Sequence, residues 1–219
     1  MYEFRGREVL TTVEEMVDPR HAALLVYDAT YASCGDSFTT GSFMRAVPDM
    51  LPRWERIIEA ARQAGVPVIY TRVLLCLDAY SGPFLRYLSK FVKDPTEGIP
   101  WVETEDRGPE NQIVKEIAPQ PGDIVMEKYF NNAYTGTAFD QILKSRGIKT
   151  IVQTGISTES GIENNARWAI IAGYYPVIVT DCVNSGYPEM HASSLRYMER
   201  SADLATADEI IEIWSRHSS

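Results

Sequence analysis

AALLVYD, residues 22–28, is a continuous apolar run that ends on an acidic residue, and it decides the fold. Runs of this kind are typical of strands that are buried on both faces of a parallel sheet. Further strands are expected at 66–75, 123–128, 150–155, 175–181 and, as a short sixth strand, within DLATADEIIEIWSRH. Helical patterns separate these strands, so the sequence predicts an α/β protein: a three-layer α/β/α Rossmann-like fold with a central, mostly parallel six-stranded sheet.

The helices are expected between the strands and at both ends of the chain. The first 20 residues read as an arm that carries one short helix. Patterns with helical period lie at 11–18, 50–64, around 84–91, around 111–117, and at 137–147, 158–172, 188–201 and the C-terminus. The proline-rich insertion 76–120 is expected to lie over the strand ends. No internal repeat or linker divides the chain, so residues 1–219 are predicted to form a single domain.

Composition excludes several classes of function. The 219 residues carry a formal charge of −9, from 21 basic and 30 acidic residues, and no Lys/Arg block. A nucleic-acid-binding protein would need a basic stripe, so no nucleic-acid partner is expected. The N-terminus lacks an apolar signal core, and no apolar run approaches the ~18 residues of a membrane helix. Three widely spaced cysteines, Cys34, Cys76 and Cys182, fit a reduced compartment, so a cytoplasmic protein without membrane contact is expected.

Two charged residues end predicted strands. Asp28 ends the first strand and Lys128 ends the third, and ligands of such sheets bind at the carboxyl ends of the strands. A carboxylate at such a place is partly desolvated, which raises its pKa unless a cation answers it. Taken singly, Asp28 could instead be a helix cap or tether a loop, and Lys128 could extend to solvent. Taken together they are candidate catalytic residues, because the sheet brings their strand ends to one edge.

The third candidate element is the segment TGISTESGIENNAR, residues 154–167. It reads as a strand, a tight turn and the start of a helix. Unpaired backbone N–H groups and the helix dipole make such a start a natural site for an anion or an oxyanion. The alternative is an ordinary helix that Ser157 or Thr158 caps.

Three segments together resemble the isochorismatase-like (cysteine hydrolase) superfamily, over about residues 16–185. AALLVYD resembles the strand that ends in the family's catalytic aspartate. EKYFNNAYTGTAFDQIL (127–143) resembles its lysine segment, and here Lys128 and Gly136-Thr137 keep the family's spacing. TGISTESGIENNARWAIIAGYYPVIVTDCV (154–183) resembles its nucleophile segment. The resemblance implies a hydrolase with Asp28 and Lys128 in the active site.

The main departure from the family pattern is Gly161, which stands where the family has its nucleophilic cysteine. Glycine cannot attack a carbonyl, so the thiolate mechanism is excluded as the family performs it. Ser160 is adjacent but about 100° away on a helix, and it is not expected to replace the cysteine. The metal-binding branch of the family has histidines in the region after its second strand. The corresponding region here contains Asp78 but no histidine. No catalytic metal and no cofactor are therefore expected.

The resemblance to true isochorismatases, which tolerate glycine at this position, implies a mechanism without a nucleophile. Asp28, protonated in its apolar setting, would protonate a vinyl ether, and water would complete the hydrolysis. Lys128 would hold Asp28 and substrate oxygens. The missing side chain at Gly161 is expected to leave room for substrate. The substrate is expected to be small and anionic.

Six further residues are candidates for substrate binding. Backbone N–H groups near Ser157 and Gly161 would bind an oxygen, and the guanidinium of Arg86 suits a carboxylate, although Arg86 could instead be a surface residue. The full candidate set is Tyr31, Arg86, Asn132, Tyr134, Ser157 and Thr158, for several of which loop packing is the alternative role. The resemblance also implies a cis peptide bond between Ile156 and Ser157.

Two other interpretations of function stay open. The chain could be a C–N hydrolase, such as an amidase or ureido hydrolase, whose catalytic cysteine is replaced by glycine at position 161. It could also be a non-catalytic homologue that binds small molecules, although idle charges at buried strand ends are costly. The family commonly forms homodimers or homotetramers, so a homo-oligomer is expected. Apolar residues at 168–175 could form a contact face or pack in the core.

Overall fold

The computed structural model describes residues 1–34, 47–74, 80–91 and 111–217. Its centre is a six-stranded sheet in the order β5-β4-β3-β6-β7-β8, and every neighbouring pair is parallel. In that order the strands are Ile124–Lys128, Val68–Val73, Ala22–Tyr27, Thr150–Ile156, Tyr175–Asn184 and Asp203–Ala205. The predicted α/β fold with its six-stranded sheet is confirmed.

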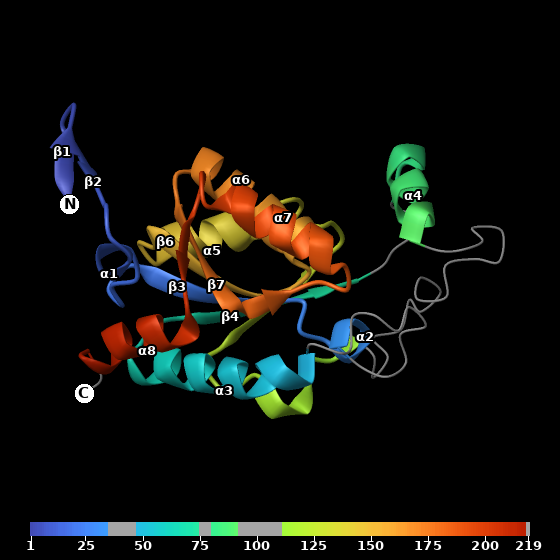
Figure 1. Cartoon of the computed structure of the whole chain (residues 1–219), viewed down its shortest axis with the longest axis horizontal. Helices are drawn as coiled ribbons and strands as arrows, with labels where there is room; N and C mark the ends of the chain where they lie inside the picture. The colour runs from blue at the N-terminus through green and yellow to red at the C-terminus, as the bar shows by residue number, and fades with distance from the viewer. Residues whose placement is uncertain (35–46, 75–79, 92–110, 218–219) are drawn as a thin grey trace.

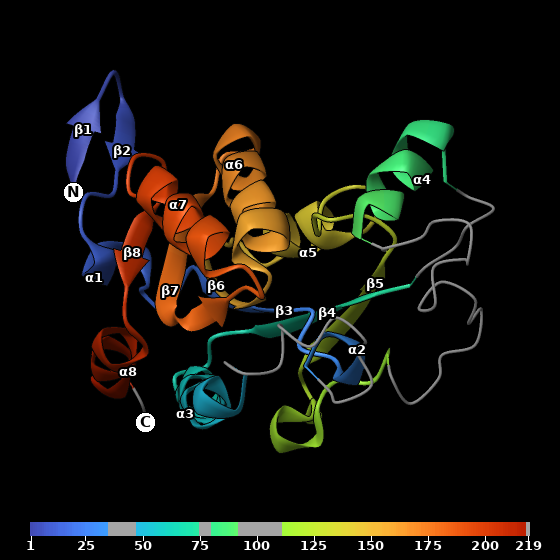
Figure 2. The same ribbon diagram turned by 45° about the vertical axis from the view of Figure 1, so that its right-hand side comes forward.

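Helices cover both faces of this sheet, as Figures 1 and 2 show. One face packs against α3 (Val47–Gln63) and α8 (Ala207–Ser215). The other face packs against α5 (Phe139–Ser145), α6 (Glu163–Ala172) and α7 (Pro188–Met198). The result is the expected three-layer arrangement.

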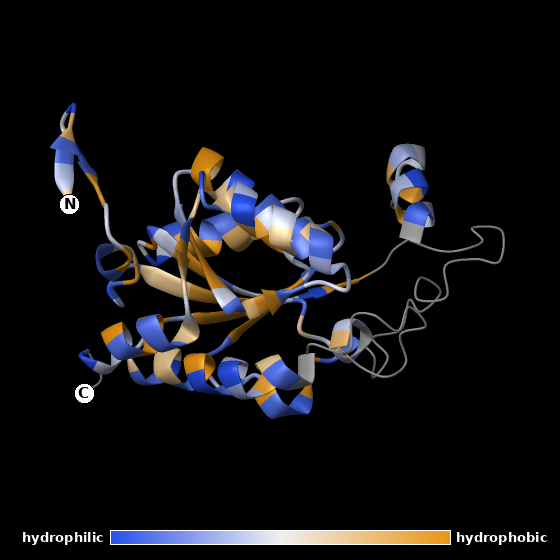
Figure 3. Ribbon diagram, in the orientation of Figure 1, coloured by the Kyte–Doolittle hydropathy of each residue, from blue (hydrophilic) through white to orange (hydrophobic). Residues whose placement is uncertain are grey.

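The central strand β3 explains how the two cores form. All six of its residues are buried, and successive side chains point to opposite faces. Leu24 and Val26 join the core beneath α3 and α8, whereas Leu25 and Tyr27 join the core beneath α5 and α6. Figure 3 shows the largely apolar strands between two layers of helices that carry both polar and apolar residues. Tyr27 is thereby directed toward the start of α6.

The order of the strands fixes the place of a ligand site. From β3 the sheet continues through β4 and β5 on one side and through β6, β7 and β8 on the other. The order in which successive strands are added to the sheet therefore reverses between β3 and β6. Ligands of open parallel sheets bind in the crevice at the carboxyl ends of the strands at such a switch point. Asp28 follows β3 directly, and the turn 157–161 follows β6.

Several elements differ from the sequence prediction. The N-terminal arm forms a hairpin of β1 (Tyr2–Phe4) and β2 (Arg7–Val9) before the expected helix α1 (Val13–Met16). Its two-residue turn, Arg5-Gly6, has positive φ at both positions, which suits a tight hairpin. The helix expected around 111–117 is only a 3₁₀ turn, Lys115–Ile117.

The insertion is described in part. Helix α4 (Gly82–Leu88) is capped by Ser81 and continues as a 3₁₀ turn, Ser89–Phe91. Cys76 and Asp78 lie outside the described residues. A short helix that the sequence did not predict, α2 (Tyr31–Cys34), follows Asp28.

The apolar residues near the end of α6 divide between surface and core. Trp168, Ile170 and Ile171 are exposed, with Ile171 79% exposed, whereas Tyr174 is buried in the core. In the parts of the chain that the structure describes, no helix has both the length and the apolar character needed to cross a bilayer.

Candidate functional site

Asp28 and Lys128 meet at the carboxyl edge of the sheet. Lys128 Nζ donates a 2.7 Å hydrogen bond to Asp28 Oδ2, and Thr71 Oγ1 donates a 2.9 Å bond to Asp28 Oδ1. Asp28 has a φ of 51°, a left-handed conformation that turns the chain out of the strand and that aspartate tolerates better than most residues. The expected juxtaposition of these two strand ends is present.

Burial controls the electrostatics of this pair. Lys128 is fully buried and Asp28 is 7% exposed. Burial raises the pKa of Asp28, against the opposing effects of Lys128 and Thr71, because a charged carboxylate is poorly solvated there. Burial lowers the pKa of Lys128 for the same reason, against the effect of Asp28. The two shifts have the same cause, because burial favours the neutral form of each group.

Two further contacts hold the Lys128 ammonium group. Its Nζ donates a 3.1 Å hydrogen bond to the carbonyl of Phe130 and lies 4.3 Å from the ring centroid of Tyr27. A cation over an aromatic face is stabilised by the ring quadrupole. Lys128 therefore contacts a carboxylate, a carbonyl and an aromatic face at once.

The turn after β6 begins with an unusual backbone. The peptide bond between Ile156 and Ser157 is cis, as the family resemblance implied. The helix expected from Thr158 starts as a π-helical turn, Thr158–Ile162, in which the N–H of Ile162 bonds to the carbonyl of Ser157 at 3.2 Å. Such π turns occur frequently at functional sites. This turn sets Gly161 against β3.

A small cavity of about 160 Å³ opens between these elements. Four of the predicted site residues line it: Asp28, Lys128, Ser157 and Gly161. The remaining lining comes from Tyr27, Ser33, Val73, Asn131, Ile156 and Ser160. Polar groups from the ends of β3, β5 and β6 therefore converge on one pocket.

The prediction that Gly161 leaves room for substrate is wrong. A Cβ atom at this position would lie 2.0 Å from Cε1 of Tyr27, 2.6 Å from Cζ and 2.8 Å from the phenol oxygen. The space that the absent side chain would take is occupied by the Tyr27 ring, because β3 directs this residue toward the start of α6. The open space of the cavity therefore lies beside the ring.

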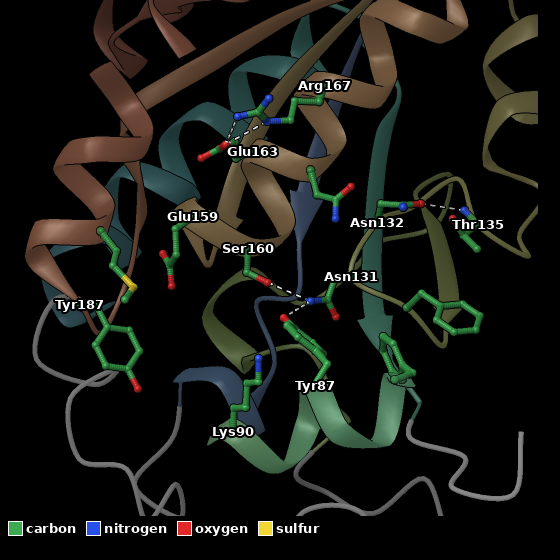
Figure 4. Close-up of a pocket in the computed structure, with 14 residues that line it drawn as sticks. Tyr87, Lys90, Asn131, Asn132, Thr135, Glu159, Ser160, Glu163, Arg167 and Tyr187 are labelled. Carbon is green, nitrogen blue, oxygen red and sulfur yellow. Dashed lines mark hydrogen bonds and ion pairs between the residues drawn. The ribbon is translucent and has the colours of Figure 1, made fainter. Parts of the chain in front are cut away.

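Figure 4 shows the residues that line a second, larger cavity of about 910 Å³. It shares Asn131 and Ser160 with the first cavity, so the two adjoin. Asn131 Nδ2 donates a 3.1 Å hydrogen bond to Ser160 Oγ and also bonds to the phenol oxygen of Tyr87. The other residues that line this outer cavity are Phe84, Tyr87, Lys90, Phe130, Asn132, Thr135, Glu159, Glu163, Asn164, Arg167, Tyr187 and Met190. This outer cavity has the size of a binding site for a small molecule.

The predicted substrate-binding residues divide between cavity and scaffold. Asn132 lines the outer cavity, but its Oδ1 accepts hydrogen bonds from the N–H groups of Tyr134 and Thr135 at 3.0 and 2.8 Å. Thr158 is fully buried, and its Oγ1 lies 2.8 Å from Nδ1 of His191. These two side chains shape the loop and the turn.

Tyr31, Tyr134 and Arg86 lie outside both cavities. The Tyr31 phenol accepts a 3.1 Å hydrogen bond from the N–H of Lys115, which ties α2 to the 3₁₀ turn Lys115–Ile117. Tyr134 is buried and packs edge-on against Phe139. Arg86 is exposed and donates to Ser89, so the prediction that it faces the substrate is wrong for this arrangement. Tyr87 of α4 and Lys90 of the 3₁₀ turn that follows line the outer cavity instead.

The sequence did not predict six residues of the small cavity, and Tyr27, Asn131 and Ser160 are the most important of them for the site. A signal was available for Tyr27, since alternation along a strand places it on the face opposite to Val26. Ser160 was set aside on the geometry of an α-helix, and the π turn brings it to the cavity wall.

Residues 22–209 match the family model described as the isochorismatase domain. The chain is 31% identical over 169 residues to N-carbamoylsarcosine amidase of Arthrobacter sp., covering 74% of this chain but only 60% of that protein. It is 29% identical over 192 residues to ureidoacrylate amidohydrolase RutB of Pseudomonas syringae pv. syringae (strain B728a), covering 78% and 74% of the two chains. A cysteine hydrolase structure from Pseudomonas syringae pv. phaseolicola 1448A has the same fold, with a TM-score of 0.78, 20% identity, and 92% and 96% of the chains covered. The chain belongs to the isochorismatase family of hydrolases.

Proposed function

We propose that this chain hydrolyses a small, anionic molecule by acid-base catalysis through Asp28 and Lys128, with water as the attacking group. The observation that carries the proposal is the buried ion pair of 2.7 Å at a cavity where position 161 offers no nucleophile and Tyr27 fills its space. Without a nucleophilic side chain at this position, the reaction must be one in which water is the attacking group.

Vinyl-ether hydrolysis fits this requirement best. Because burial raises its pKa, Asp28 retains a proton closer to neutral pH than an ordinary carboxyl group does. Transfer of that proton to the terminal vinyl carbon gives an oxocarbenium ion. Water adds to the cation and loses a proton, and the hemiketal breaks its C–O bond. The products are a ketone that bears a new methyl group and an alcohol.

The two cavities suggest how substrate lies. The reacting end would enter the small cavity beside Asp28 and Lys128, and the rest of the molecule would occupy the outer cavity. Lys128 would hold the ionised form of Asp28 after proton transfer. Ser157 and the backbone at Gly161 line the same space and could bind a substrate oxygen. Lys90, on the wall of the outer cavity, is suited to an anionic group.

C–N hydrolysis is the second candidate, because two relatives are named as an amidase and an amidohydrolase of carbamoyl or ureido compounds. In this chain such a reaction would need Asp28 to act as a base that activates water directly. Tyr27 occupies the space that a side chain at position 161 would need. This disfavours a C–N hydrolase site that differs from the family pattern only in lacking the cysteine. A purely binding role is disfavoured because an idle buried ion pair is costly to maintain.

The test is a substrate comparison with wild type and Asp28→Asn. Enolpyruvyl ethers such as isochorismate and chorismate are assayed beside N-carbamoylsarcosine and ureidoacrylate. We expect turnover of an ether, a loss of about 100-fold or more in kcat for Asp28→Asn, and one solvent deuterium in the new methyl group in D2O. Asp208→Asn, at a side chain 73% exposed, is the matched control and should keep wild-type turnover. Unchanged turnover by Asp28→Asn would refute the mechanism, and amide cleavage without ether cleavage would favour the second candidate.

A further inference from the structure

Building on the proposed function, we propose that Tyr27 is the residue that determines the reaction type of this site. Its ring takes the volume that a nucleophilic side chain at position 161 would need, and it holds the Lys128 ammonium group beside Asp28. Tyr27 and Gly161 then form a matched pair that confines the site to reactions in which water attacks.

The contact between the two residues is too close for any side chain at 161. Tyr27 points from β3 toward α6, and the π turn presents the α-carbon of Gly161 to the ring. A Cβ atom there would meet Cε1, Cζ and the phenol oxygen of Tyr27 at 2.0, 2.6 and 2.8 Å. Real Cβ atoms do not approach other heavy atoms so closely, so either the ring or the turn would have to move.

The Tyr27 ring is held on several sides. It is 1% exposed, and its phenol donates a 2.5 Å hydrogen bond to the carbonyl of Asn131. The strand behind it is equally fixed, because Gly155 approaches so closely that a Cβ atom there would lie 2.0 Å from the Tyr27 carbonyl oxygen. Moving the ring would break the bond to Asn131 and open a void in a closely packed core.

The fixed ring has a second effect, on Lys128. The ammonium nitrogen lies 4.3 Å from the ring centroid while it donates to Asp28. Burial, together with the charge of Asp28, raises the pKa of the Tyr27 phenol well above its ordinary value, so the phenol stays protonated. Tyr27 is therefore a positioning and specificity-determining residue, and it is not a nucleophile in place of the missing thiol.

The first experiment measures access to a thiol introduced at position 161 in three variants: Gly161→Cys, Tyr27→Phe with Gly161→Cys, and Tyr27→Leu with Gly161→Cys. Phenylalanine keeps the two ring carbons that block the position, whereas leucine lacks all three blocking atoms. Iodoacetamide labels each folded protein, and peptide mass spectrometry follows the introduced thiol, with Cys34 and Cys182 as internal references. We expect labelling in the leucine variant at least about tenfold faster than in the other two. Equal labelling in all three would overturn the proposal.

The second experiment measures stability and does not depend on any thiol or substrate. Gly161→Ala should lower the melting temperature by roughly 5 °C or more, and at least half of that loss should disappear in a Tyr27→Leu background. Tyr27→Phe should give no such rescue. If Gly161→Ala is as damaging beside leucine as beside tyrosine, or fails to fold in both, the two residues are not a matched pair and the proposal is wrong.

The outcomes separate this proposal from the proposed function. Thiol labelling and melting report only whether Tyr27 closes position 161, whatever the enzyme hydrolyses. A matched pair together with no ether hydrolysis would remove the proposed reaction and keep the role of Tyr27. The double variant Tyr27→Leu with Gly161→Cys is then assayed on N-carbamoylsarcosine and ureidoacrylate. Gain of amide hydrolysis in that double variant alone would extend the proposal from access to reaction type, whereas the same gain in the single variant Gly161→Cys would refute it.

Discussion

Lys128 Nζ lies 2.7 Å from Asp28 Oδ2, across 100 positions of sequence, in a pair that is almost entirely shielded from water. Removing one member leaves the other charge buried without its partner, which is far more costly than losing a surface ion pair. The pair is therefore expected to couple stability and catalysis.

The first prediction concerns this coupling. Lys128→Met and Asp28→Asn should each lower the free energy of unfolding by about 3–5 kcal/mol, and the double variant should lose less than the sum by about 1–3 kcal/mol. Denaturant unfolding of the four proteins measures the cycle. The exposed pair of Lys144 and Asp140 is the control, and Lys144→Met should cost about 0.5 kcal/mol or less. Additive losses at Asp28 and Lys128 would show that the pair is not energetically coupled.

The second prediction concerns the pH dependence of turnover. A general acid must be protonated, so kcat/KM should fall as pH rises through the pKa of Asp28, which burial raises above the ordinary value of 3.8. Lys128 lowers this pKa, so Lys128→Met should shift the titration of the Asp28 carboxyl to higher pH. Kinetics of the wild type and carbon NMR of the variant measure the two effects. A rate that rises with pH over the same range would assign Asp28 the role of a base.

The third prediction concerns the contact between β6 and β3. Gly155 has a φ of 117°, and a Cβ atom there would lie 2.0 Å from the Tyr27 carbonyl oxygen, so Gly155→Ala should cost about 4 kcal/mol or more. Gly173 also has a positive φ, 93°, but a Cβ atom there would meet nothing within 4 Å, so Gly173→Ala should cost only about 1 kcal/mol. Denaturant unfolding of the two variants separates the cost of backbone strain from the cost of the steric contact. Equal losses of unfolding free energy would mean that the close approach of β6 to β3 adds nothing to the cost at Gly155.

The sequence predicted Asp28 and Lys128 because the carboxyl ends of parallel strands must share one edge. It could not predict that Tyr27 fills the space at Gly161. That contact depends on a π turn, and spacing rules for an α-helix place residues 160 and 161 differently. It also misjudged Arg86, since which face of α4 meets the cavity depends on packing and not on the local pattern. Thr158 was expected to bind substrate, but its hydroxyl lies against His191.

The fourth prediction concerns His191, which contacts the π turn through Thr158. Burial lowers the pKa of His191 below 6.5, against the opposing effect of Glu159. As pH falls below 6.5, His191 is therefore protonated in the unfolded chain before it is protonated in the folded protein. The free energy of unfolding decreases as pH falls toward the pKa of His191 in the folded state. Melting temperatures between about pH 7.5 and about pH 5.5 should drop more for wild type than for His191→Gln, which cannot titrate. Parallel curves for the two proteins would exclude this contribution.

The fifth prediction concerns the outer cavity and compares two cations on one helical segment. Lys90 lines the cavity, whereas Arg86, four positions earlier, is exposed and bonds to Ser89. If the substrate carries an anionic group in the outer cavity, Lys90→Ala should raise KM about two- to fivefold with little change in kcat, because an exposed charge contributes modestly to binding. Arg86→Ala should leave both constants unchanged. The Lys90 effect should weaken in high salt, since screening reduces an attraction between exposed charges. A larger effect at Arg86 than at Lys90 would mean that substrate approaches from the other side of α4, and that the cavity is not the binding site.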